Sequence, residues 1–181
     1  MTTFVALLRG INVSGQKSIR MVDLRNSFTA LGFANVRSYL QSGNLVFDAS
    51  RAEPRKLASA IKARIADDFG HEVEVFVLTA KQLDLVASSN PLPPRRGADE
   101  KIFHGTFLFQ PVSKAFFQKL KLPVQAGEQA VLIGQVVLLH CPHGYGRTKL
   151  NNVFFEKALK LSATTRNWRT ILALQALCTQ R

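Results

Sequence analysis

The sequence predicts an α+β fold made of two similar halves. Predicted strands and helices follow the order β-α-β-β-α-β up to about residue 78, a similar order returns after residue 100, and a proline-rich stretch lies between them. Hydrophobic residues form 46% and charged residues 20% of the 181 positions, a composition typical of a folded chain with a core. We therefore expect halves at residues 1–78 and 101–181, joined by a helix and linker over residues 79–100.

The first half begins with a short apolar strand that Gly10 ends. Apolar residues three or four apart predict two helices, and the turn residues 41–44 predict a hairpin. The expected elements are a strand over 4–9, a helix over 21–31, strands over 36–40 and 45–47, a helix over 53–69 and a strand over 73–77. This order is the ferredoxin-like, or split βαβ, pattern.

The second half follows a predicted helix over residues 79–88 and a proline-rich linker over residues 90–97. Its expected elements are a strand over 102–109, a helix over 113–120, a hairpin over 131–139 and a helix over 151–161. No closing strand is evident, so we expect a C-terminal helix over about residues 166–178 to replace it. The result is a second, modified ferredoxin-like half.

The basic charge is concentrated in the second half. The net charge is +12, and after residue 100 eleven basic side chains face only two carboxylates, Glu128 and Glu156. This asymmetry favours an anionic partner: nucleic acid, a phosphorylated small molecule or an acidic protein surface. The alternative is that the charge serves only solubility.

The cellular setting follows from what the chain contains. Two cysteines, Cys141 and Cys178, cannot form a disulfide framework and indicate a reducing compartment. The apolar run at the start is shorter than the ~7–15 residues of a secretory segment, and no run approaches the ~18 apolar residues of a membrane helix. We expect a cytoplasmic protein without a membrane partner.

The first candidate site is a glycine-containing loop over residues 140–149, between a predicted strand and a predicted helix. Its candidate anion-binding residues are Gly144, Gly146, Arg147, Thr148 and Lys149. Free N–H groups at a helix start attract anions, although neither a Walker loop nor a dinucleotide fingerprint is present and an ordinary turn would also need glycine. A metal site at His140, Cys141 and His143 is not expected, because adjacent strand residues point to opposite faces.

The second candidate site is the segment over residues 164–170. A threonine N-cap would place Arg166 and Arg169 in or beside the first helical turn, with Asn167 between them. Cations there oppose the helix dipole at a cost of ~0.3–1 kcal/mol each. The pattern therefore predicts an acidic partner, either an external anion or a carboxylate elsewhere in the fold. Trp168 could stack on a base, but core packing with Ile171 is favoured.

A secondary candidate loop contains Arg9, Asn12 and Lys17. If the second strand runs antiparallel to the first, the turn at residues 41–44 lies at the other end of the sheet, and the two loops need not form one site. Turn chemistry alone then explains residues 41–44. No catalytic residue or cofactor is assigned, because carboxylates are scarce in the second half and no Gly-x-Ser-x-Gly elbow occurs.

Four ordered motifs span residues 7–13 (LLRGINV), 39–47 (YLQSGNLVF), 144–150 (GYGRTKL) and 164–170 (TTRNWRT). Together they resemble a known bacterial family, domain of unknown function 1697. The chain departs from the family at Ser14, where glycine is frequent. The resemblance implies a duplicated ferredoxin-like fold and no established activity, cofactor or catalytic residue.

Three functional hypotheses remain open. The first is a non-catalytic nucleic-acid-binding module, suggested by the charge and the basic loops. The second is an enzyme or sensor for a small phosphorylated or carboxylated metabolite, held by Arg147, Lys149, Arg166 and Arg169. The third is a scaffold whose halves pack and dimerise.

Overall fold

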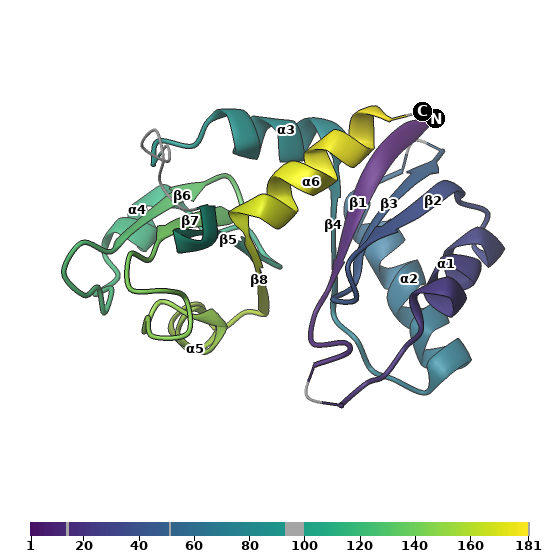
Figure 1. Cartoon of the computed structure of the whole chain (residues 1–181), viewed down its shortest axis with the longest axis horizontal. Coiled ribbons are helices and arrows are strands. Elements are labelled where there is room, and N and C mark those ends of the chain that lie inside the picture. The colour runs from purple at the N-terminus through teal and green to yellow at the C-terminus, as the bar shows by residue number, and fades with distance from the viewer. Residues whose placement is uncertain (14, 51, 93–99, 181) are drawn as a thin grey trace. The chain divides into compact units, whose positions relative to one another are not determined.

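A computed structural model describes residues 1–13, 15–50, 52–92 and 100–180, which divide into two compact units (Figure 1). Unit 1 comprises Met1–Asp84 and Ala173–Arg181, and unit 2 comprises Leu85–Leu172. The expected domain boundaries therefore need correction at the C-terminus, because Ala173–Arg181 belong with the first unit. Ser14 and most of the expected proline-rich linker lie outside the described residues.

Unit 1 has the predicted element order. It contains β1 (Thr2–Leu8), α1 (Met21–Ala30), β2 (Ala34–Tyr39), β3 (Asn44–Ala49), α2 (Pro54–Phe69) and β4 (Val75–Thr79). The strands pair antiparallel in the order β2-β3-β1-β4, and α1 and α2 cover one face of the sheet (Figure 1). This is the ferredoxin-like arrangement. Helix α3 (Ala80–Ser88) follows β4.

Both faces of the unit 1 sheet are buried. Alternate residues Phe4, Ala6 and Leu8 of β1 belong to the core beneath the helices, where Phe33 stacks on Phe47 at a ring distance of 4.5 Å. The residues between them, such as Val5 and Leu7, point to the other face and are buried as well. The sheet therefore offers no open apolar face.

Unit 2 repeats this topology. It contains a 3-10 turn (Glu100–Ile102), β5 (Phe103–Leu108), α4 (Lys114–Gln118), β6 (Gln129–Ile133), β7 (Val136–His140), α5 (Asn152–Leu159) and β8 (Ala163–Asn167). The strand order β6-β7-β5-β8 matches that of unit 1 position by position. The two ferredoxin-like halves are thus confirmed, as is the C-terminal helix α6 (Trp168–Thr179).

The closing strand of unit 2 corrects the prediction that a helix replaces it. Residues Ala163–Asn167 form β8, which pairs antiparallel with β5, and α6 follows the strand. Ala163 is the only apolar residue in β8, so the strand has no apolar alternation and is fixed by its pairing. Because the strand continues to Asn167, this residue caps the helix: its Oδ1 accepts a hydrogen bond from the Thr170 amide at 2.8 Å.

The first turn of α6 packs closely on β5. A Cβ added to Gly105 would lie 2.7 Å from Cδ1 of Ile171, the end of that side chain, so a larger residue at this position would require Ile171 to shift. Trp168 and Ile171 are buried, which confirms the expected core packing. Among the described helices, none combines the length and hydropathy needed to span a bilayer.

Candidate functional site

The two sequence motifs of unit 2 meet at one end of its sheet. Strands β7 and β8 both run antiparallel to β5, so they end at the same side. The loop over residues 141–151 follows β7, and α6 follows β8. The Tyr145 hydroxyl donates a hydrogen bond to Oγ1 of Thr165 at 3.0 Å, which joins the loop to β8.

A network of hydroxyl groups surrounds this contact. Oγ1 of Thr165 lies 2.6 Å from Oδ1 of Asn152 and 2.8 Å from Oγ1 of Thr106. Since the amide oxygen of Asn152 can only accept, Thr165 donates to it, and the Thr106 and Tyr145 hydroxyls must donate to Thr165. The hydroxyl of Thr165 is therefore fully used within the protein.

His104 stacks against Tyr145 with a ring distance of 4.6 Å. The side chain is buried, and its Nδ1 has no hydrogen-bond partner among the described residues. Burial lowers the pKa of His104 to about 4. The ring is thus neutral near pH 7 and adds no positive charge for an anion.

The predicted anion-binding loop is tied to its neighbours by its backbone. Gln125 Nε2 donates to the carbonyl oxygen of Arg147 at 3.1 Å, and Oγ1 of buried Thr148 accepts from the Leu150 amide at 3.0 Å. Thr148 therefore supports the loop. Arg147 and Lys149 have exposed side chains. Both predicted glycines lie in this loop: Gly144 has a φ of +89°, and Gly146 is exposed.

The two histidines of this region also have structural contacts. Ring nitrogens of His140 and His143 lie 3.0 Å from the carbonyl oxygens of Gly127 and Ala126. Among the described residues, no group of three or more His, Cys, Asp and Glu side chains is placed to hold a metal ion.

The four predicted cations are not all brought together. Arg166 pairs in register with Gly105, and its Nη1 donates to Oγ1 of Thr164 at 2.8 Å, on the face opposite Thr165. Burial lowers the pKa of Arg166 to about 10. Arg147, Lys149, Asn167 and Arg169 belong to segments at one end of the sheet, and Arg166 points to the other face.

In unit 1, the two loops that were expected to be separate lie together. Nδ2 of Asn12 donates to the carbonyl oxygen of Gln41 at 2.7 Å, and the Leu8 amide donates to the Gly43 carbonyl at 2.8 Å. The expectation was wrong because β1 and β2 both pair antiparallel with β3 and therefore run in the same direction. Their ends meet at one side of the sheet.

The residues of this secondary candidate site organise the backbone. Asn12 also bonds the main chain of Ile19 through both side-chain atoms, at 2.9 and 2.8 Å. The Lys17 ammonium donates to the Glu72 carbonyl, and the Arg9 amide donates to the Glu74 carbonyl at 2.9 Å. Asn12 and Lys17 thus hold three loops together.

The helical side of unit 2 is a feature that the sequence motifs did not single out. Helices α4 and α5 pack together through Phe117 and Phe155, whose rings lie 6.5 Å apart. We define the helical layer of unit 2 as these helices with residues 109–128 and 141–162. Its exposed cations are Lys114, Lys119, Lys121, Arg147, Lys149, Lys157 and Lys160.

The two carboxylates of this layer each accept a hydrogen bond from a backbone amide of unit 2. Glu128 is buried, and its Oε2 accepts from the Gln125 amide at 2.9 Å. Oε1 of Glu156 accepts from the Ala163 amide at 2.9 Å. The excess of basic residues after residue 100 is visible in the sequence and could have suggested this layer. The hydrogen bonds of its two carboxylates are visible only in the structure.

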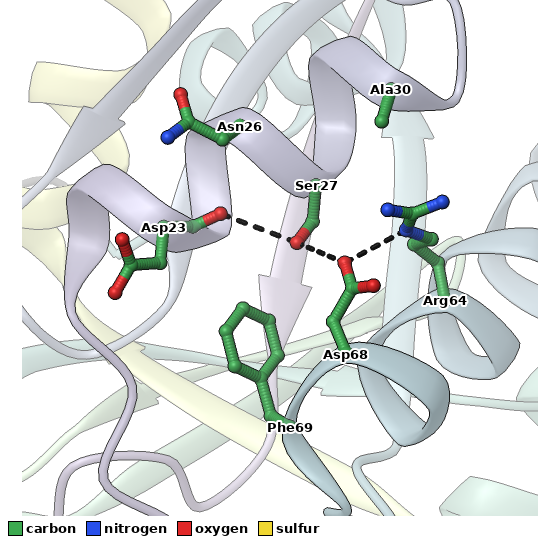
Figure 2. Close-up of a pocket in the computed structure, with 7 residues that line it drawn as sticks. All are labelled: Asp23, Asn26, Ser27, Ala30, Arg64, Asp68 and Phe69. Atoms are coloured by element: carbon green, nitrogen blue, oxygen red, sulfur yellow. Dashed lines mark hydrogen bonds and ion pairs between the residues drawn. The ribbon is translucent and has the colours of Figure 1, made fainter.

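The helices of unit 1 provide an internal comparison, because the fold is the same. Figure 2 shows the groove between α1 and α2, where Asp68 accepts from Oγ of Ser27 at 2.5 Å and from Nε of Arg64 at 2.7 Å. These two bonds, the one from Ser27 first, lower the pKa of Asp68. Asp23 pairs with Arg20 at 2.7 Å. Charges of both signs thus lie on this side, and these two carboxylates are paired with arginines.

Three comparisons place the chain among known proteins. A family model described as "Protein of unknown function (DUF1697)" matches residues 1–138. A solved structure of a conserved bacterial protein from Streptococcus pneumoniae is similar, with a TM-score of 0.76 and 21% identity over 98% of this chain and 99% of that chain. At that identity the likeness concerns the fold. No curated protein matches the sequence.

Proposed function

The chain belongs to the DUF1697 family, whose description gives no activity, and we propose from its own residues that it is a nucleic-acid-binding module. The binding surface is the helical layer of unit 2. One observation carries the proposal: seven exposed cations lie on this layer, whereas Glu128 and Glu156 are both engaged by backbone amides.

The distribution of the cations favours a polymer of phosphates. The cations occupy seven separate positions between Lys114 on α4 and Lys160 just after α5, a number that suits a partner with many phosphates. A polyanion gains affinity from each cation that neutralises a phosphate, because each contact releases condensed counterions. Contacts of this kind position a nucleic acid without reading its sequence.

The mode of binding differs from that of RNA-recognition modules. Those modules stack bases on aromatic side chains of an open sheet face. Here the equivalent residues of β5, Phe103 and Phe107, are buried, as are Val5 and Leu7 of β1. We therefore assign the contacts to helices and loops, and we expect weak base preference.

The alternative is a small phosphorylated or carboxylated metabolite held by Arg147, Lys149, Asn167 and Arg169. Their segments share one end of the sheet, which supports this alternative. The hydroxyl of Thr165 is already used by Asn152, Tyr145 and Thr106, and Thr148 faces the protein backbone. These two hydroxyls are therefore not available to orient a small ligand, and we favour the polymer as partner.

The test compares charge reversals in the two units. Binding of a fluorescein-labelled oligonucleotide is followed by anisotropy for the wild type, for Lys149→Glu with Lys157→Glu, and for the matched control Arg55→Glu with Lys56→Glu on α2. All four side chains are exposed. We expect roughly tenfold or greater weakening for the unit 2 variant and little change for the control. Equal weakening in both variants, or no binding by the wild type, would overturn the proposal.

A further inference from the structure

Strand β6 is an edge of the unit 2 sheet, and some of its backbone groups have no partner in the part of the chain that the structure describes. Its two-residue turn, Gly134 and Gln135, closes on the pair Ile133 and Val136. Hydrogen-bonded and non-bonded pairs alternate from that point, so the N–H and C=O groups of Ala130 and Leu132 point away from β7. The described residues supply no hydrogen-bond partner to these outward groups.

Several features by which proteins protect a sheet edge are absent within β6 itself. Residues Gln129–Ile133 contain no charge, no proline and no bulge, and the four apolar ones are partly exposed. Edge strand β2 of unit 1 has such protection. Its register shifts between Ala34 and Arg37, and the Arg37 guanidinium donates to the carbonyl oxygen of Gln180 at 2.5 Å. An open, uncharged edge is a template for another strand.

We propose that β6 receives an extended acidic segment of a partner protein by strand addition. The outward groups of Ala130 and Leu132 can form main-chain hydrogen bonds with such a segment, and alternate side chains supply specificity. This role goes beyond nucleic-acid binding, because a nucleic acid cannot continue a ladder of peptide groups.

The charge of the connection that leads into β6 favours an acidic partner. The connection that brings the chain from β5 to β6 carries the exposed side chains Lys114, Lys119 and Lys121, and its carboxylate, Glu128, is buried. Val124 in the same connection is 50% exposed and offers an apolar contact. A second copy of the chain would carry the same lysines in the connection that leads into its own β6, and like charges oppose pairing of the two edges.

The experiment uses the full chain and a capped heptapeptide that alternates glutamate and valine. Amide hydrogen exchange is measured by NMR with and without the peptide. We expect slower exchange at Ala130 and Leu132, and little change at Val131 and Ile133, whose amides already bond β7. A matched heptapeptide that alternates lysine and valine should have no effect.

Two variants test the two parts of the proposal. Ala130→Pro removes one outward donor at a position where an edge strand tolerates proline, and it should abolish peptide binding while leaving oligonucleotide binding unchanged. Lys119→Glu with Lys121→Glu should reverse the preference toward the lysine peptide. The proposal is overturned if Ala130→Pro remains folded by thermal melting and still binds the peptide like the wild type. It is also overturned if the double variant keeps the preference for the acidic peptide. A third contrary result is protection of the outward amides by self-association as the protein concentration rises.

Discussion

The hydroxyl of Tyr145 donates to Oγ1 of Thr165 across 3.0 Å and thereby ties the loop after β7 to the closing strand of unit 2. Two motifs separated in the sequence thus form one structural unit. The cations Arg147 and Lys149 lie in the same loop, two and four residues after Tyr145.

Loss of the Tyr145 hydroxyl should destabilise unit 2 modestly. Tyr145→Phe removes one donor to Thr165 and should cost about 1 kcal/mol of unfolding free energy. Thr165→Val leaves Tyr145, Thr106 and Asn152 with a lost partner, so its cost should be larger, about 2 kcal/mol or more. Urea unfolding of both variants measures the two values. A smaller cost for Thr165→Val would contradict the assigned network.

The burial of His104 predicts a pH-dependent stability. Its native pKa of about 4 lies below the ordinary value of 6.5, so the unfolded state binds the proton more readily. Above pH 6.5 the free energy of unfolding includes the full contribution of the neutral ring. As the pH falls from 6.5 to about 4, this contribution is lost, which lowers the free energy of unfolding by up to about 3 kcal/mol. Below the native pKa no further loss arises from this residue.

The variant His104→Phe isolates this effect. Urea unfolding at about pH 7 and at about pH 4.5 should show a clearly smaller pH dependence for the variant than for the wild type. The same dependence in both proteins would assign it to other groups. The aromatic replacement keeps a ring against Tyr145, so that the comparison concerns the ionisation.

Gly43 is expected to be the more sensitive of two glycines with similar backbone angles. Gly10 and Gly43 have φ values of +70° and +74°, but a Cβ at Gly43 would lie 2.7 Å from Cβ of Leu8, whereas Gly10 has open space. Gly10→Ala should cost about 1 kcal/mol from backbone strain alone. Gly43→Ala should cost at least about 2 kcal/mol more, because the clash involves an atom fixed to the strand. Equal thermal shifts would contradict this close approach.

The two thiols should react slowly in the native state. Burial raises the pKa of Cys141 and of Cys178 to about 11, so little of the reactive thiolate is present at mildly alkaline pH. Titration with a chromogenic disulfide reagent should show slow reaction in buffer and rapid reaction in urea. Rapid native reaction of either thiol would show that its segment opens readily.

Local patterns in the sequence predicted most elements of the fold. The apolar spacing of α2 and the alternation in β4 are strong signals, and both elements lie close to their expected places. Strand β8 was missed because Ala-Thr-Thr-Arg-Asn has no apolar alternation, and its pairing with β5 is a long-range property. The helix cap was consequently placed at a threonine instead of Asn167.

The sequence predicted the positive charge of the candidate site, but it did not predict where each side chain of the site lies. The scarcity of carboxylates after residue 100 is visible in the sequence, but the burial of Glu128 is not. Arg166 was grouped with Arg169 because both were expected on one helix. Once Arg166 is placed in β8, alternation directs it away from Thr165.

The salt dependence of nucleic-acid binding tests the central claim most directly. For the wild type, the logarithm of the binding constant should fall linearly with the logarithm of salt concentration. The variant Lys149→Gln with Lys157→Gln should give a slope shallower by roughly two, and Arg55→Gln with Lys56→Gln should match the wild type. A flat response of the wild type, or an equal change of slope in the unit 1 control, would contradict a binding surface on the helical layer of unit 2.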